Sequence, residues 1–364
     1  MSKAAELAKA GETLTNQPSG RKNIVTNGAM QVAQRSASVT GIGANYGGYF
    51  TCDRWRIYAQ DTAGRLTMTQ TADGPSGFAN CLKLDCTTAD TSIAAAEFLL
   101  LQQRFEGQDL QQLKKGTSDA ELITISFYVK ANAAFDFVLE LQDSDNTRNI
   151  HKVFTTTTGW VRHELTFPAD TTGAFDDDNV SSFQLNIWLH AGATFAGGTL
   201  NTAWASSTNA NRAAGIDSFY SSTDNNFFIT GVQMEIGSQA TNFEHRSFGE
   251  ELALCQRYCT KIAPTATNAS LGTGFARTTT TVHAVRELPV QMRTTPTLAF
   301  SAAADFQVQY LGSVITTTAM AASELSADTI AFQATVGAAS LTAGQGMYIR
   351  DLDGGSTIIA TAEL

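Results

Sequence analysis

Polar and aromatic residues alternate with apolar residues in several segments of this chain, and they are the first candidates for chemistry. If residues 182–190, SFQLNIWLH, form a strand, the polar side chains and the tryptophan share one face and the apolar side chains the other. Two further polar-face residues come from the segments ITISFYVKA and WVRHELTF. The candidate ligand-binding residues are Tyr128, Arg162, Gln184, Asn186, Trp188 and His190. An aromatic ring beside amides and charged donors suits a sugar, because the ring stacks on its apolar face while the amides meet its hydroxyls.

The same residues have a plainer interpretation, which the sequence leaves open. A loop or another subunit could cover this face, and Trp188 would then simply pack beneath it. His163 falls on an apolar face, where a histidine hydrogen-bonded within the core is expected more often than a ligand.

Motifs for catalysis, metal binding or cofactor binding are missing from the sequence or incomplete. The chain has no G-x-S-x-G, H-E-x-x-H or Walker motif, and the glycines of GIGANYGG miss the dinucleotide spacing. Cys255 and Cys259 make half a zinc site at most, so we interpret them as core thiols. The acidic loops 143–146 and 176–179 are either solvated turns or calcium ligands without the full spacing of a calcium loop. We therefore assign no catalytic residue, metal or cofactor, and expect no enzymatic activity.

Composition excludes other classes of function. The net charge is −10 and no basic run occurs, so nucleic-acid binding is not expected. No apolar stretch reaches the roughly 20 residues that span a bilayer, and the N-terminus lacks the apolar core of a secretory signal. We therefore expect a protein that is made in a cytoplasm, stays soluble and does not insert into a membrane. The 5 cysteines are irregularly spaced, which favours free, mostly buried thiols over a disulfide framework.

The elements that must position the candidate residues are mostly strands. Period-two alternation recurs in short segments separated by Gly, Asn, Asp and Thr, which indicates an antiparallel sandwich with one solvent-facing side per sheet. We predict an all-β protein in which residues 23–262 form a jelly-roll-like β-sandwich closed by a helix. That helix has a capping box at Ser247 and Glu250, and we expect it to end at Lys261.

Three further parts complete the expected organisation. Residues 1–22 contain a short helix and a linker; they are either a frayed terminus or a peptide that docks on a larger particle through Ala4, Leu7 and Ala8. Residues 263–364, rich in Thr and Ala, predict a second, smaller β domain. The segment NIVTNGAMQVAQRS, residues 23–36, is expected to begin the sandwich, with Asn27-Gly28 as its turn and apolar residues in the core; these are Ile24, Val25, Met30 and Val32.

Six segments taken together resemble bacteriophage tail-fibre and related virion appendage proteins of marine-phage type. They are NIVTNGAMQVAQRS, YFTCDRW, SFYVKA, GWVRHELTFPAD, FFITGVQMEIG and TNFEHRSFGEELALCQRYC, which occur in this order over about residues 23–262. The resemblance departs at Cys259, where the family often carries an aromatic residue, and the chain has no long repetitive shaft. These fibres are similar in sequence style to carbohydrate-binding sandwich modules.

The resemblance implies a structural virion protein: a compact tail fibre or receptor-binding appendage that recognises host cell-surface polysaccharide. It also implies a homotrimer located in the virion, with other phage tail or capsid proteins as partners. The alternative is a capsid decoration or head-fibre protein that needs no glycan. A depolymerase is less favoured, because the chain shows no repetitive β-helix with paired carboxylates.

Overall fold

The computed structural model describes residue 3, residues 21–310 and residues 312–364. The chain divides into two compact units, residues 1–251 with Leu364 and residues 252–363. The division falls earlier in the chain than the domain end predicted at residue 262. Within the described residues, no helix combines the length and the apolar character that crossing a membrane requires.

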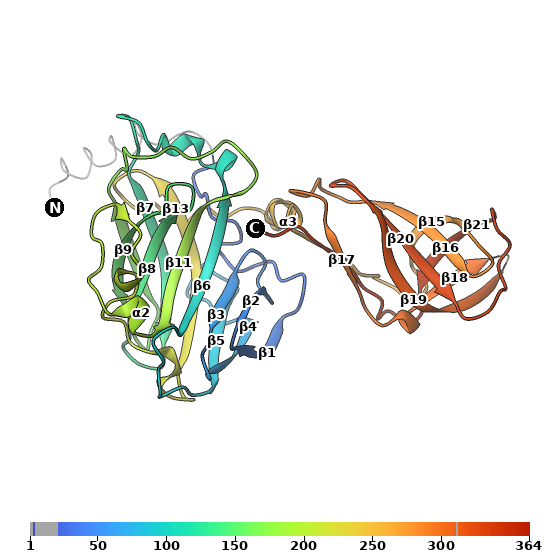
Figure 1. The fold of residues 1–364 in the computed structure, drawn as a ribbon, viewed down its shortest axis with the longest axis horizontal. Helices are drawn as coiled ribbons and strands as arrows, with labels where there is room; N and C mark the ends of the chain where they lie inside the picture. The colour runs from blue at the N-terminus through green and yellow to red at the C-terminus, as the bar shows by residue number, and fades with distance from the viewer. Residues whose placement is uncertain (1–2, 4–20, 311) are drawn as a thin grey trace. The chain divides into compact units, whose positions relative to one another are not determined.

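Unit 1 is the predicted antiparallel β-sandwich (Figure 1). Its first layer, sheet A, has six strands in the order β1 (Ser38–Gly43), β4 (Arg65–Thr71), β5 (Cys81–Thr88), β13 (Asn226–Ile236), β7 (Ile123–Ala131) and β10 (Val161–Phe167). Its second layer, sheet B, has seven strands in the order β12 (Ala205–Ser206), β9 (Arg148–Thr155), β8 (Asp136–Asp143), β11 (Ser181–Ala191), β6 (Phe98–Glu106), β3 (Arg56–Gln60) and β2 (Tyr46–Tyr49). The core between the layers is built from the alternating apolar residues of both sheets.

Unit 2 is the predicted smaller β domain. Six of its strands close into a barrel in the order β15 (Ser270–Ala276), β16 (Thr281–Glu287), β20 (Thr329–Val336), β19 (Ser313–Leu325), β18 (Phe306–Tyr310) and β21 (Gly346–Asp351). A separate three-stranded sheet runs β14 (Cys259–Ile262), β22 (Ile358–Thr361) and β17 (Thr297–Phe300). Barrel closure leaves no free edge among the six strands.

The described helices are short. They are α2 (Ala193–Ala196), α3 (Phe248–Gln256) and the 3₁₀ turns Gly107–Asp109, Gln111–Leu113, Asn209–Asn211, Phe219–Ser221 and Ala303–Asp305. The capping box of α3 is confirmed, since the amide of Ser247 donates to Glu250 Oε2 at 3.1 Å and the amide of Glu250 to Ser247 Oγ at 3.3 Å. The predicted end at Lys261 is wrong. The chain enters β14 at Cys259, which pairs with Thr361 of β22, and backbone pairing there replaces another helical turn.

The segment from residue 23 to residue 36 begins the sandwich as a buried turn rather than a strand. Its main chain lies against β13, where the register shifts between Thr230 and Gln233, and the Val232 amide donates to the Gly28 carbonyl at 3.0 Å. Val25 and Met30 enter the inter-sheet core, and Asn27 adopts a positive φ of 56°, as the turn prediction requires. The predicted docking residues Ala4, Leu7 and Ala8 lie outside the described residues.

Candidate functional site

The outer face of sheet B carries rows of side chains that run across its strands. Backbone register sets these rows, because residues opposite each other on neighbouring strands share a face. One row is aromatic and apolar: Tyr58, Leu100, Trp188 and Val138. The next is polar and charged: Arg56, Gln102, Asn186, Glu140 and His151. A third is polar: Arg104, Gln184, Gln142 and Asn149.

A pocket of about 210 Å³, which we call the sheet-B pocket, opens over these rows. Its apolar lining is Tyr58, Phe98, Leu100, Trp188 and Phe195, and its polar lining is Gln102, Arg104, Gln142, Gln184 and Arg212. The segment after β11, which includes α2, covers part of the face and supplies Phe195 and Arg212. Pockets for drug-sized ligands typically measure about 300–1,000 Å³, so this one has room for a smaller unit such as a sugar ring.

Glu140 anchors the polar side of the pocket. It is buried, and Arg212 donates to both of its oxygens at 2.8 Å. Trp188 Nε1 donates to the same carboxylate at 2.8 Å. Burial alone would raise the pKa of Glu140, but the Arg212 charge and the hydrogen bonds from His151 and Arg212 outweigh it and hold that pKa well below its usual range. Glu140 is therefore an ionised structural anchor and not an available acid or base.

The hydrogen-bonding groups left over at the pocket are mainly donors. Gln102 Oε1 accepts from Arg56 Nη1 at 2.9 Å and from Arg104 Nε at 2.8 Å, so one neutral amide holds two guanidinium groups close together. Burial and the charge of Arg104 lower the pKa of Arg56. Arg104 also donates to the main-chain oxygen of Leu364 at 3.1 Å. Within the described residues neither arginine pairs with an Asp or Glu side chain, so both cations still offer N–H groups to a ligand.

Trp188 does not offer a ring face to a ligand, contrary to the sequence prediction. Its side chain is 1% exposed, with the Arg212 guanidinium 4.9 Å above the ring and Phe98 and Phe195 packed against it. A loop therefore covers this residue, which is the alternative that the sequence had left open. Tyr58 is the half-buried aromatic side chain of the pocket, held by Arg56 at 4.5 Å and by an edge contact with Phe98.

Five of the six predicted ligand residues divide between the outer faces of sheet A and sheet B, and the sixth, His190, is buried. Gln184 and Trp188 line the sheet-B pocket, and Asn186 lies buried in its floor with its amide donating to Glu140 at 3.0 Å. Tyr128 and Arg162 face each other across β7 and β10 of sheet A. Alternation along a strand separates inside from outside, but it does not tell which sheet a strand joins.

His190, the sixth predicted residue, is fully buried and belongs to a different cluster from the pocket. Its Nδ1 lies 2.8 Å from Ser218 Oγ. Burial lowers its pKa, against the raising effect of Glu97 and Asp90.

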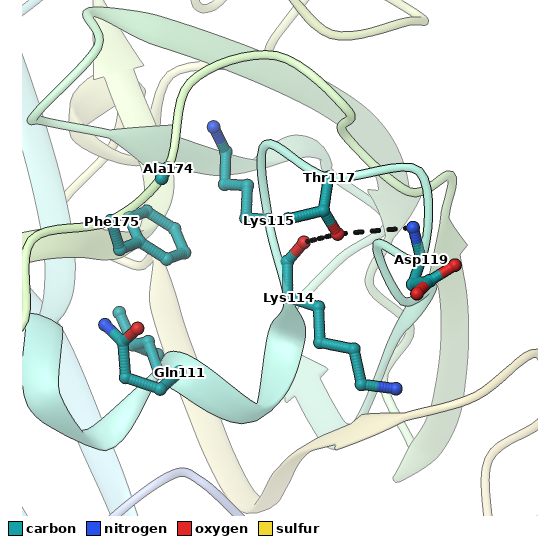
Figure 2. Close-up of a pocket in the computed structure, with 8 residues that line it drawn as sticks. Gln111, Lys114, Lys115, Thr117, Asp119, Ala174 and Phe175 are labelled. Carbon is teal, nitrogen blue, oxygen red and sulfur yellow. Dashed lines mark hydrogen bonds between the residues drawn. The ribbon is translucent and has the colours of Figure 1, made fainter.

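A second pocket of unit 1, of about 390 Å³, lies at the 3₁₀ turn that ends at Leu113 (Figure 2). Its most distinctive side chain is Lys115, which is 5% exposed. The Lys115 ammonium contacts Asp143 Oδ2 at 2.5 Å and Asp170 Oδ2 at 3.2 Å, and it donates to the carbonyls of Thr172 and Gly173. Lys114 pairs with Glu121 at 2.6 Å. Because both ammonium groups are engaged, this larger pocket offers a ligand less than the sheet-B pocket does.

The two acidic loops lie side by side in this region. The Asp176 amide donates to Asp145 Oδ2 at 3.0 Å, and Asn146 Nδ2 donates to the Ala174 carbonyl at 2.8 Å. The Lys115 ammonium lies among oxygen atoms of Asp143, Asp170, Thr172 and Gly173. A lysine therefore supplies the positive charge beside Asp143 that a calcium ion would otherwise provide.

The predicted burial of the cysteines is confirmed for all five. Burial raises the pKa of both Cys81 and Cys86 to about 11, so these thiols are poor nucleophiles.

Sequence reasoning missed most of the pocket. Arg56 and Tyr58 alternate with Ile57 and Ala59, and this signal could have been found. Gln102 and Arg104 follow the apolar run of β6, which hides the alternation. Arg212 belongs to an irregular segment, in which no alternation of apolar and polar residues indicates which side chains face the pocket.

Comparisons with known proteins give likenesses of shape at low identity. No family model matches the sequence, and the search of curated proteins gave no match. Among solved structures, the bacteriophage CBA120 tailspike protein 4 enzymatically active domain has 11% identity and a TM-score of 0.31, over 59% of this chain and 21% of that one. TmCBM61 in complex with beta-1,4-galactotriose has 8% identity and a TM-score of 0.31, over 60% of this chain and 100% of that one. A family 11 carbohydrate-binding module of Clostridium thermocellum has 14% identity and a TM-score of 0.27, over 58% and 100%.

Proposed function

We propose that the sheet-B pocket binds a glycan, and that the glycan is acidic. The observation that carries the proposal is a pocket whose lining combines the half-buried Tyr58 with Arg104, and Arg56 lies beside it on the shared amide of Gln102. Neither guanidinium pairs with an Asp or Glu side chain of the described residues. The Arg56 guanidinium lies over one face of the Tyr58 ring at 4.5 Å, so a sugar would stack on the other face of that half-buried ring. The arginines can hold a carboxylate or sulfate with charge-assisted hydrogen bonds.

The role is binding without catalysis. The Glu140 carboxylate contacts the pocket lining, and its oxygens accept hydrogen bonds from Arg212, Trp188 and Asn186. Glycoside hydrolysis uses a pair of free carboxyl groups on either side of the scissile bond. Among the described residues, the pocket lining contains no Asp or Glu, which supports a binding role.

The test compares binding to immobilised acidic oligosaccharides, containing uronic acids or sulfate, with binding to neutral ones. The full chain is expected to bind the acidic set, and Tyr58→Ala to weaken binding by about tenfold or more, which is about 1.4 kcal/mol. Arg104→Gln is expected to reduce the preference for acidic over neutral sugars. Tyr128→Ala is the matched control, because Tyr128 is a half-buried tyrosine on the outer face of sheet A. Equal binding by the wild type and Tyr58→Ala would show that the sheet-B pocket is not the glycan-binding site.

We further propose that the protein acts as a virion component of a bacteriophage, a compact tail fibre or receptor-binding appendage that assembles as a homotrimer. The ordered series of sequence segments that resembles tail-fibre proteins supports this role. The proposed glycan pocket would be the part of the protein that binds the host polysaccharide. Residues 1–22 would then dock on the particle and unit 1 would meet the host surface.

A reconstruction of whole virions tests the location and the assembly state together. The expected result is three copies around an axis on the tail. Density on the capsid lattice, in a protein that binds no glycan, would replace this role with capsid decoration.

A further inference from the structure

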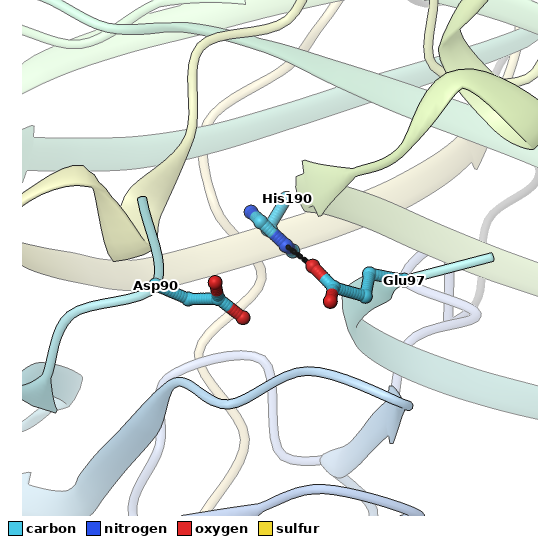
Figure 3. Close-up of side chains that lie close together, drawn as sticks. All are labelled: Asp90, Glu97 and His190. Carbon is cyan, nitrogen blue, oxygen red and sulfur yellow. Dashed lines mark ion pairs between the residues drawn. The ribbon is translucent and has the colours of Figure 1, made fainter. Parts of the chain in front are cut away.

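Three buried side chains with metal-binding chemistry meet at one end of sheet B, apart from the glycan pocket. They are Asp90, in the segment between β5 and β6, Glu97, directly before β6, and His190, near the end of β11. Asp90 and Glu97 are each 5% exposed and His190 is 0% exposed. One donor atom from each residue lies within 4.8 Å of the other two, and Figure 3 shows the side chains converging.

Two atoms of this cluster point into it without a hydrogen-bond partner. Within the described residues, Glu97 Oε2 and His190 Nε2 are buried and make no hydrogen bond. They lie 3.4 Å apart and form an ion pair with each other when His190 is protonated, as the dashed line in Figure 3 marks. Leaving a buried polar group unsatisfied costs about 1–3 kcal/mol, and more for a charged one. When the imidazole is neutral, the buried Glu97 carboxylate has no charged partner in this contact, and a cation held by both side chains would supply one.

The surrounding contacts orient both sides of the cluster. His190 Nδ1 lies 2.8 Å from Ser218 Oγ; when Nδ1 donates to that oxygen, the lone pair of Nε2 points toward the carboxylates. Asp90 Oδ2 accepts from Thr62 Oγ1 at 2.9 Å and from the Ala63 amide at 2.7 Å. A hydrogen bond behind each ligating group is the support that metal ligands usually have.

We propose that Asp90, Glu97 and His190 bind one divalent transition-metal ion, for which zinc is the best match. An imidazole with two carboxylates is a zinc-type ligand set, whereas calcium takes about 6–8 oxygen ligands. Tetrahedral zinc, with ligands at about 2.0–2.2 Å, places ligand atoms about 3.4 Å apart. Glu97 Oε2 and His190 Nε2 already have that separation. The ion also neutralises the charge of two buried carboxylates.

The position of the site suggests what the ion does. Phe98 follows Glu97, and Trp188 precedes His190 by two residues; both line the sheet-B pocket. The Gly192 amide also donates to the Glu97 carbonyl at 2.8 Å, so the covering segment starts at the same place. A metal here would join β6 to β11 at the apolar end of the pocket and hold its aromatic wall in position.

The test uses the full chain without a polyhistidine tag, stripped with a chelator and then titrated with zinc alone or calcium alone. The expected result is one zinc per chain by elemental analysis, with a higher midpoint of thermal unfolding. With cobalt in place of zinc, visible absorption bands typical of a nitrogen-containing site should appear. Zinc that fails to bind, or calcium that binds at this site in its place, would overturn the proposal.

Two variants and a control separate metal binding from folding. Glu97→Gln and His190→Gln preserve approximate size and should weaken zinc binding by about 100-fold or more, with loss of the cobalt bands. His163→Gln is the control, because His163 is half-buried on β10 and hydrogen-bonded to the Thr155 carbonyl. Variants that fold, as judged by tryptophan fluorescence, and still bind one zinc as tightly as the wild type would contradict the assignment. If neither variant folds, the cobalt spectrum of the wild type tests the assignment. Absorption bands typical of an all-oxygen site, with no nitrogen ligand, would contradict the proposed role of His190.

Discussion

At the scale of single residues, buried charges in unit 1 are neutralised by specific partners. Glu140 lies under Arg212, and Asp143 and Asp170 hold Lys115. Removing one member of a buried pair leaves the other charge uncompensated, which typically costs about 3–5 kcal/mol. The polar side of the sheet-B pocket therefore depends on Glu140 for its stability as well as for its geometry.

The first prediction concerns Glu140 and acid. Its folded-state pKa lies below the ordinary value of 4.5, so its contribution to the free energy of unfolding is complete above pH 4.5 and is lost as the pH falls toward the folded-state pKa. Glu140→Gln should lower the free energy of unfolding near pH 7 by about 3 kcal/mol. It should also flatten the loss of stability below pH 4.5.

Denaturant titrations followed by tryptophan fluorescence measure this effect in unit 1 alone, because all 4 tryptophans, Trp55, Trp160, Trp188 and Trp204, lie there. Glu164→Gln serves as the control, since Glu164 is exposed on β10. If the free energy of unfolding of Glu140→Gln falls below pH 4.5 as steeply as that of the wild type, the role assigned to Glu140 is contradicted.

At the scale of elements, alternation predicted the strands well, because side chains on a half-buried strand must alternate between core and outer face. Ile123, Ile125, Phe127 and Val129 face the core as expected. Alternation cannot predict which strands share a sheet, so it does not show that Tyr128 and Trp188 lie on different sheets. Nor could it show that the segment holding Arg212 would cover Trp188, because long-range packing decides that contact. The end of α3 was wrong for a similar reason: β22, nearly a hundred residues away, pairs with Cys259.

The second prediction concerns the contact between the first turn and β13. A Cβ atom on Gly28 would lie 2.1 Å from the Val232 carbonyl oxygen, so Gly28→Ala must displace one of the two main chains. We expect the free energy of unfolding of unit 1 to fall by about 1–3 kcal/mol. Gly159→Ala is the control, because nothing lies within 4 Å of its added Cβ. Equal stability of the two variants, measured by tryptophan fluorescence in denaturant, would show that the first turn is not tightly docked.

At the scale of the whole molecule, the two units separate a binding surface from a second β domain. The proposed pocket lies entirely in unit 1, and so does the proposed metal site. The net charge of −10 does not favour an acidic ligand for the chain as a whole. At the pocket the local charge is positive, because Arg104 lines it and Arg56 shares the Gln102 amide with Arg104. A glycan at that pocket would meet the local charge of these side chains rather than the net charge of the chain.

A crystal structure of the full chain with the acidic oligosaccharide that binds most tightly would test the proposed glycan site. We expect a sugar ring against Tyr58, with its carboxylate or sulfate within hydrogen-bond distance of Arg56 or Arg104. A sugar bound on the outer face of sheet A, near Tyr128 and Arg162, would contradict it.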